Sequence, residues 1–334
     1  MRAHTVILGA GATIAAIPKG DKYGRKSSVM NGLIKKLHLE DILSKVELKT
    51  ASDNLEDIYS ELYSRPECKE VLSILEQRLY DYFSSLQLPD EPTVYDLLIL
   101  SLTKKDVIAT FNWDPLLLQA YVRCHDLTDN LPHILCLHGN VAMGYCKEHK
   151  EYGLTDAICP VCHKFLAPTK LLYPVADKDY EKDDYIKGCW EATEWIIENS
   201  YMLTIFGYSA PSSDKKAVSL LKKAWGDLED RDLEEVSVID IIDEDAMLEK
   251  WSDFIYTHHY RYTNDFYNSY LGMFPRRTCE TIFATFQLNV WADNQKGFKP
   301  GMSWDEVKDK ISPLIKEEHE TPEGKNYSLY YSAI

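Results

Sequence analysis

Asn112, Asp114 and His138 are the side chains best placed for chemistry, because each follows an apolar run that predicts a buried strand. Asn112 and Asp114 stand just beyond the run at 106–111. An amide there can bond a sugar hydroxyl or an attacking water, although Asn-x-Asp also forms plain turns and helix caps. His138 precedes Gly139, which would let a ligand approach closely. A single histidine is more often structural, but its ordinary pKa of about 6.5 suits a general base.

A metal-type quartet follows directly along the chain. Cys146 and His149 are separated by two residues, as are Cys159 and Cys162, and nine residues lie between the pairs. Three thiolates and one imidazole make a closed tetrahedral zinc site, so we expect a structural Zn²⁺ here. The competing interpretation is chance clustering of these residues.

A glycine turn, Gly9-Ala10-Gly11-Ala12-Thr13, ends the first apolar run of the chain. Backbone amides in such a turn can bind a pyrophosphate at a helix N-terminus, although a simple tight turn is the alternative. The third glycine of the usual dinucleotide fingerprint is missing, which disfavours an ordinary nicotinamide dehydrogenase.

Two more strand ends complete the set. The run at 201–206 stops at Gly207-Tyr208-Ser209, and the run at 236–242 stops at Asp243. Asp243 could accept hydrogen bonds from a ribose, as an acidic residue does in dinucleotide-binding folds. It could equally begin a loop or cap the next helix.

Strands and helices alternate along most of the chain, which predicts a Rossmann-like, doubly wound parallel sheet of the α/β class. Helical spacing at 29–49 and 53–85 predicts a helical insertion over about 30–92, closed by Pro89 and Pro92. Further helices are expected at 93–103, 115–125, 185–199 and 213–225. We expect a nucleotide-binding domain over 1–250 with a zinc module at 141–168, and an accessory segment over 251–334.

Composition narrows the class of partner. The chain has 334 residues, with 53 acidic and 37 basic residues and a net charge of −16, which argues against nucleic acid or an anionic membrane. No apolar run is long enough for a transmembrane helix. The eight cysteines do not suggest a disulfide framework, and the clustered ones among them have metal spacing. We therefore expect a soluble, cytoplasmic protein.

Taken together and in order, these motifs resemble the sirtuin family over about residues 1–250. The resemblance rests on Gly9–Thr13, the strand end Thr110-Phe111-Asn112-Trp113-Asp114, His138-Gly139, the Cys/His quartet, Gly207-Tyr208-Ser209 and Ile242-Asp243-Glu244-Asp245. It implies that NAD⁺ is bound and that Asn112, Asp114 and His138 surround the nicotinamide ribose. The residues that would hold the rest of NAD⁺ are Gly9, Ala10, Gly11, Thr13, Gly207, Ser209 and Asp243.

Departures from the family pattern bear on the activity. Phe111 replaces the family's glutamine, residues 171–175 replace its Phe-Gly-Glu stretch, and His149 replaces a fourth cysteine. These departures resemble the prokaryotic, defence-associated branch, whose members hydrolyse NAD⁺ during phage infection. That resemblance implies a homo-oligomer or a complex with a regulatory defence protein.

The leading hypothesis is therefore an NAD⁺ glycohydrolase in which Asn112 positions water and His138 takes a proton. The alternatives are an NAD-dependent protein-lysine deacylase and a non-catalytic subunit that senses NAD⁺ or ADP-ribose.

Overall fold

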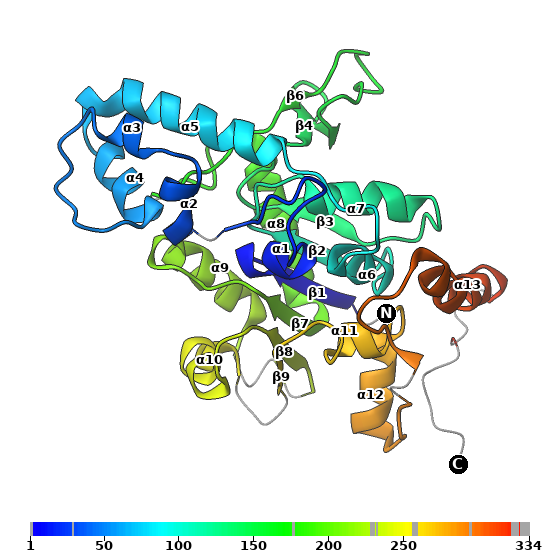
Figure 1. Ribbon diagram of the computed structural model, residues 1–334. Coiled ribbons are helices and arrows are strands. Elements are labelled where there is room, and N and C mark those ends of the chain that lie inside the picture. Colours follow the sequence, from blue (N-terminus) through cyan, green and yellow to red (C-terminus); the bar gives the residue numbers. More distant parts are fainter. Residues whose placement is uncertain are drawn as a thin grey trace.

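A six-stranded sheet forms the centre of the protein (Figure 1). The computed structural model describes residues 3–28, 30–175, 178–227, 231, 233–255, 260–293, 296–321 and 327. The sheet has the order β3-β2-β1-β7-β8-β9, and each pair of neighbours is parallel. Its strands are β1 (Ala3–Leu8), β2 (Val107–Thr110), β3 (His133–Cys136), β7 (Ser200–Phe206), β8 (Glu235–Ile239) and β9 (Tyr260–Thr263).

Both faces of the sheet are covered, which explains why its strands read as continuous apolar runs. Val6 and Leu8 of β1 point to one face, where they join a core with α1 (Ala10–Ala16), α6 (Val94–Leu100) and α7 (Leu116–His125). Ile7 points to the other face. There it joins the core formed with α8 (Asp184–Glu198), α9 (Lys215–Trp225) and α10 (Glu244–Trp251). The expected doubly wound parallel α/β fold is confirmed.

The strand order reverses between β1 and β7. From β1 the chain moves outward through β2 to β3, and then returns to β7 on the other side of β1 before continuing to β8 and β9. Connections that leave the carboxyl ends of β1 and β7 diverge to opposite sides, so a crevice opens there. Ligands of open α/β sheets bind in such crevices.

The helical insertion lies across this crevice as a separate lobe (Figure 1, dark blue to cyan). Its helices are α2 (Met30–Lys36), α3 (Glu40–Leu43), α4 (Leu55–Tyr63), the 3₁₀ turn η1 (Pro66–Cys68) and α5 (Lys69–Ser84). The stretch expected to be helical at 29–49 is two short helices instead, because His38 has a φ of 50° and turns the chain between them. The stretch at 53–85 is interrupted at Pro66, which lacks the amide that would continue α4.

A small antiparallel sheet holds the zinc-type quartet. It has the order β5-β4-β6, with β4 (Met143–Cys146), β5 (Glu151–Leu154) and β6 (Ala167–Pro168). It projects from the body of the protein at the top of Figure 1. The expected small module at 141–168 corresponds to this unit.

The C-terminal segment is part of the same body. β9 pairs with β8, so the main sheet continues past residue 250. Beyond it lie α11 (Tyr270–Met273), α12 (Thr278–Leu288) and α13 (Trp304–Glu320). Arg276 and Arg277 are both buried and both bond the Glu318 carboxylate, which fastens α13 to the body. No helix in the described part of the chain is both long and apolar enough to cross a membrane.

Candidate functional site

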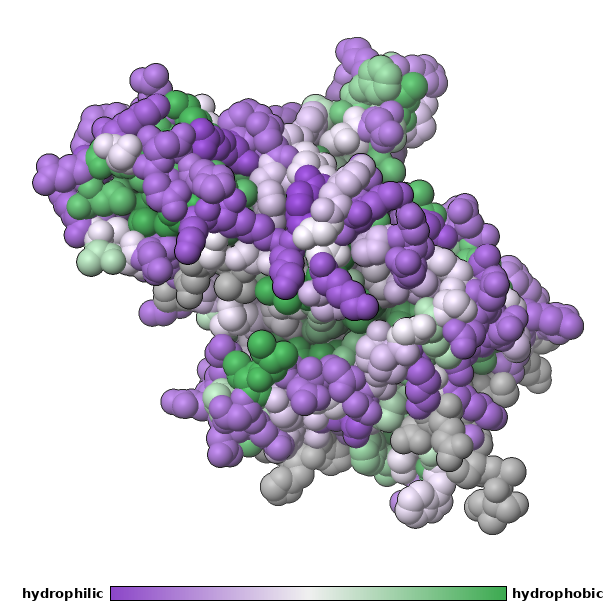
Figure 2. Space-filling view, viewed as in Figure 1, coloured by the Kyte–Doolittle hydropathy of each residue, from purple (hydrophilic) through white to green (hydrophobic). Residues whose placement is uncertain are grey.

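A cavity of about 360 Å³ opens at the carboxyl edge of the sheet, beside the point where the strand order reverses. Its floor comes from α1 and from the segments that follow β2, β3 and β7. Its opposite wall comes from the helical insertion, through Met30, Leu33, Glu56 and Phe83. Figure 2 shows the viewed face hollowed between the insertion lobe and the rest of the protein, with hydrophobic side chains at the recess. The insertion therefore closes what would otherwise be an open crevice.

The predicted site residues divide into three groups. Asn112, His138, Ala10, Thr13, Asp114 and Ser209 line the cavity. The three glycines pack against one another between β1 and β7. Asp243 is exposed and caps α10 by accepting a hydrogen bond from the Ala246 amide at 3.0 Å, the plainer of the two interpretations of its sequence position.

The glycines are required by a close crossing of the two strand-end turns. A Cβ on Gly9 would lie 2.6 Å from the Gly207 carbonyl oxygen, and one on Gly207 would lie 2.3 Å from the Ala12 nitrogen. The Gly9 and Gly11 amides donate to the carbonyls of Phe206 and Gly207 at 3.1 and 2.8 Å. These two amides thus hold the turns together, which leaves Ala10 and Thr13 as the members of this turn that face the cavity.

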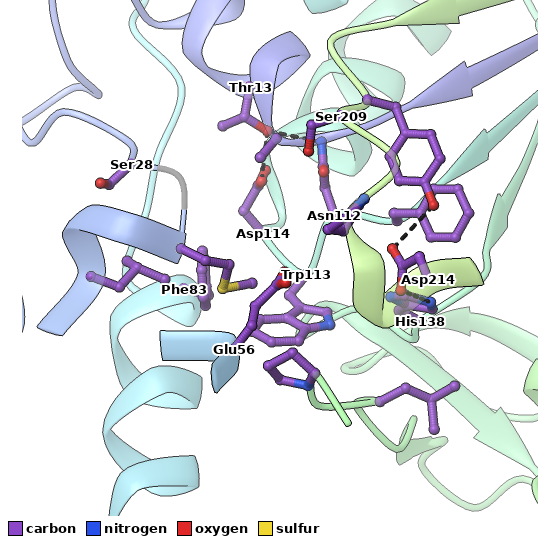
Figure 3. Close-up of a pocket in the computed structure, with 18 of the residues that line it drawn as sticks. Thr13, Ser28, Glu56, Phe83, Asn112, Trp113, Asp114, His138, Ser209 and Asp214 are labelled. Atoms are coloured by element: carbon purple, nitrogen blue, oxygen red, sulfur yellow. Dashed lines mark hydrogen bonds and ion pairs between the residues drawn. The ribbon is translucent and has the colours of Figure 1, made fainter. Parts of the chain in front are cut away.

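Thr13, Asn112 and Asp114 lie close together in the cavity (Figure 3) and form one buried hydrogen-bond network with Tyr95. The Thr13 hydroxyl donates to Asp114 Oδ2 at 2.8 Å, so the Tyr95 hydroxyl, 2.7 Å from Thr13, must donate in turn. Asp114 Oδ1 accepts from the Leu116 amide at 3.1 Å and caps α7. Burial raises the pKa of the Asp114 carboxyl despite these bonds. Asp114 therefore positions its neighbours and also caps a helix.

Asn112 uses its amide nitrogen for structure and leaves its oxygen for a ligand. Nδ2 donates to the Gly9 carbonyl at 2.9 Å and lies 3.0 Å from the Thr13 hydroxyl. Because a carbonyl can only accept, this contact fixes which end of the amide is nitrogen. Within the described residues Oδ1 has no hydrogen-bond partner, and the residue lines the cavity. Asn112 can thus accept a hydrogen bond from a hydroxyl or a water.

Asn140 is a supporting residue that sequence reasoning missed. Its side-chain nitrogen donates to the backbone carbonyls of Asn112 and Asp114 at 3.2 and 2.6 Å. It thereby ties the loop after β3 to the loop after β2. The His-Gly-Asn order was visible in the sequence, but the acceptors lie more than twenty residues away.

His138 is buried, with 5% of its surface exposed, and it remains neutral. Burial lowers its pKa to about 3, opposed by the nearby Asp214 carboxylate and assisted by Lys178. The ordinary value expected from sequence does not apply, because burial penalises the charged ring. Gly139 is needed by the fold: its φ is +74° and a Cβ there would lie 2.0 Å from the Lys170 carbonyl oxygen.

Aromatic rings pack around His138 on the cavity floor. Phe111 and Tyr208 stack with centroids 4.2 Å apart and planes inclined by 8°. Phe111 also meets the His138 ring edge to face at 4.8 Å, and Tyr180 lies parallel to that ring at 6.0 Å. Phe111 and Tyr180 therefore give His138 an apolar surface on two sides of its ring.

Beside His138 lies a cluster of charged residues that the sequence analysis did not predict. Lys178 pairs with Asp214, and both are 4% exposed. Tyr208 donates to the second Asp214 oxygen at 3.1 Å. Across the cavity, Ser213 bonds Glu56, and burial raises the pKa of the Glu56 carboxyl. Lys178 lies in a loop and Asp214 just before α9, so neither position carried a local signal of function.

The Cys/His quartet belongs to the small unit of β4–β6, which projects from the body of the protein (Figure 1). The ligand atoms of Cys146, His149, Cys159 and Cys162 all lie within 4.8 Å of one another. Backbone hydrogen bonds lower the pKa of the Cys159 thiol to about 7, which favours the thiolate form. Three thiols and one imidazole around a common centre fit Zn²⁺, and their closed geometry leaves no position for a substrate.

Structural comparison finds similar solved structures among the sirtuins. Sir2 bound to an inhibitor, 2′-O-acetyl-ADP-ribose and a deacetylated p53 peptide is 12% identical, with a TM-score of 0.38 over 86% of this chain and 94% of that chain. Sir2 with a p53 peptide and NAD⁺ is 13% identical, with a TM-score of 0.38 over 86% and 93%. No family model matches the sequence, and no curated protein matches it.

Proposed function

We propose that the protein is an NAD⁺ glycohydrolase, which cleaves NAD⁺ with water to ADP-ribose, nicotinamide and a proton. The observation that carries this proposal is that His138 and the free oxygen of Asn112 line one cavity at the switch point of a parallel sheet. Dinucleotides bind at such switch points.

The chemistry of the cavity suits the nicotinamide ribose. The stacked rings of Phe111 and Tyr208 offer an apolar surface, and the helical insertion supplies the other wall of the cavity. As the bond between ribose and nicotinamide breaks, its electron pair passes to the nicotinamide nitrogen and the ribose becomes an oxocarbenium-like cation. Asn112 Oδ1 accepts a hydrogen bond from a ribose hydroxyl or from the water that attacks this cation.

His138 takes the proton that this water must lose. A histidine with a pKa of about 3 is a weak base, but water that bonds to a cationic carbon becomes strongly acidic. A weak, neutral base is therefore sufficient, and it needs no prior deprotonation at neutral pH. General-base assistance of this kind contributes about 10²–10⁴-fold in rate.

The first experiment measures nicotinamide release by the purified protein and two variants, His138→Ala and Asn112→Ala. We expect each variant to lose about 10²–10⁴-fold in kcat while its far-UV circular dichroism is unchanged. His133→Ala is the matched control, because His133 is exposed at the opposite end of β3 and should leave the rate intact. Wild-type rates in both cavity variants would refute the assignment.

The two other hypotheses predict different results in the same assay. A protein-lysine deacylase would need an acylated peptide before NAD⁺ is consumed, and would transfer the acyl group to ADP-ribose. A sensing subunit would bind NAD⁺ or ADP-ribose without turnover. Cleavage that is rapid without peptide and unchanged by adding it supports the glycohydrolase.

A role in antiphage defence through NAD⁺ depletion is proposed from the sequence resemblance alone, together with a homo-oligomer or a regulatory defence partner. The corresponding measurement is the NAD⁺ content of infected cells that carry wild-type protein or His138→Ala. Depletion that is equal in both would contradict this role.

A further inference from the structure

A buried ion pair stands directly behind His138. The Lys178 ammonium contacts Asp214 Oδ1 and donates to the Ser213 carbonyl at 3.2 Å. Asp214 Oδ1 also lies 3.9 Å from His138 Nε2 (Figure 3). Burying a carboxylate and an ammonium is costly, and a buried pair adds little stability compared with apolar residues of the same size. A pair placed against the proposed base calls for a functional explanation.

The two ring nitrogens of His138 have different surroundings. Nε2 is fully buried, lacks a hydrogen-bond partner among the described residues, and lies 3.9 Å from Asp214 Oδ1. Nδ1 also lacks a hydrogen-bond partner among the described residues, but unlike Nε2 it is not fully buried. Because His138 lines the cavity, Nδ1 is the ring nitrogen that the cavity exposes. If Nδ1 is to accept a proton, Nε2 must carry the hydrogen of the neutral ring.

Two side chains hold the Asp214 carboxylate in place. Lys178 contacts one carboxylate oxygen and the Tyr208 hydroxyl donates to the other at 3.1 Å. Glu56 faces the same region from α4 through its bond with Ser213. The aromatic rings of Phe111 and Tyr180, which carry no charge, also contact the His138 ring. Asp214 is thus the anion best placed to act on the imidazole.

We propose that Asp214 is a positioning residue for His138: it favours the tautomer with hydrogen on Nε2 and stabilises the imidazolium formed when Nδ1 takes a proton from the attacking water. The proposal rests on the glycohydrolase assignment. The Lys178 ammonium partly cancels the effect of the Asp214 charge on the pKa of His138. His138 therefore stays neutral until a positive charge develops in the cavity. One proton moves from water to Nδ1 and then to solvent after the products leave, and Asp214 keeps its charge throughout.

Charge-removing variants separate this role from a merely structural ion pair. In Lys178→Met the Asp214 charge is unopposed, so NMR titration of labelled histidine should find the pKa of His138 raised by about one unit or more. In the double variant Lys178→Met/Asp214→Asn both charges are gone, and the pKa should fall back. If the Lys178–Asp214 pair had only a structural role, the pKa of His138 would not rise in the single variant and fall back in the double variant. Replacing both partners together also avoids leaving one buried charge unpaired.

Activity gives the second readout. The double variant should lose about tenfold or more in kcat with KM nearly unchanged, since removing a charge that acts only on the protonated ring affects the transition state. Asp90→Asn, which breaks the exposed pair with Lys22, is the control for loss of an ion pair. A folded double variant with wild-type kcat would overturn the proposal, as would an unchanged His138 pKa in Lys178→Met. If the wild-type protein cleaves no NAD⁺, the glycohydrolase assignment fails, while the NMR titration still decides whether Asp214 acts on His138.

Discussion

Acid should destabilise this protein through its buried histidines. Burial lowers the pKa of both His138 and His4 to about 3, whereas an unfolded chain returns them to about 6.5. The unfolded state therefore binds protons that the folded state does not bind. The stability contributed by each neutral ring is fully present above about pH 6.5 and is lost as pH falls towards the folded pKa.

The size of the effect follows from these values. Lowering the pH from about 7 to about 5 costs about 2 kcal/mol of unfolding free energy for each buried histidine. The carboxyls of Asp106, Asp114 and Glu56 act in the opposite direction, because burial raises the pKa of each. The pH dependence of the unfolding free energy of wild-type protein is thus a sum of contributions from several groups. The contribution of His138 is isolated by comparison with a variant.

Equilibrium urea unfolding of wild type and His138→Gln at about pH 7, 6 and 5 provides that comparison. We expect the variant to lose about 2 kcal/mol less than wild type over this range, whatever its stability at pH 7. His133→Gln should lose as much as wild type, because His133 is exposed. Equal losses in wild type and His138→Gln would refute the reasoning that burial keeps this ring neutral.

Two further predictions concern the turns and the metal. Gly207→Ala places a Cβ 2.3 Å from the Ala12 nitrogen at a φ of +58°, and should cost about 2–5 kcal/mol in urea unfolding. Gly188→Ala, in the open interior of α8, should instead stabilise slightly, and equal effects of the two changes would contradict the packing described. Cys159→Ser should reduce the zinc content measured by mass spectrometry and increase hydrogen exchange over β4–β6, with residues 107–114 still protected. Loss of protection throughout the chain would show that the zinc module supports the whole fold.

Much of the site could be predicted because it depends on short stretches of sequence. Asn112 and His138 were found because polar residues after apolar runs mark strand ends, and the carboxyl ends of parallel strands share one edge. The quartet of Cys146, His149, Cys159 and Cys162 was found from its spacing. Asp243 also follows a strand, but it caps the helix that it precedes. The sequence around one strand end does not tell whether a polar residue there lines the cavity or caps a helix.

The contacts that set the chemistry could not be predicted in the same way. Lys178 and Asp214 stand 36 residues apart and meet only because the loop before α8 and the segment before α9 converge on His138. The pKa of His138 depends on its burial against Phe111 and Tyr180, which no local pattern encodes.

The sequence by itself determined the alternating elements, the parallel sheet, the sheet edge that carries the candidate site and the composition of the zinc-type cluster. These follow from hydrophobic periodicity and from spacing over a few residues. Only the tertiary structure decided that Gly9 and Gly207 pack against each other, that the side-chain oxygen of Asn112 is left free for a ligand, and that Asp214 lies beside Nε2 of His138. Those features are distances between segments far apart in the chain, and burial and charge act through distance in space.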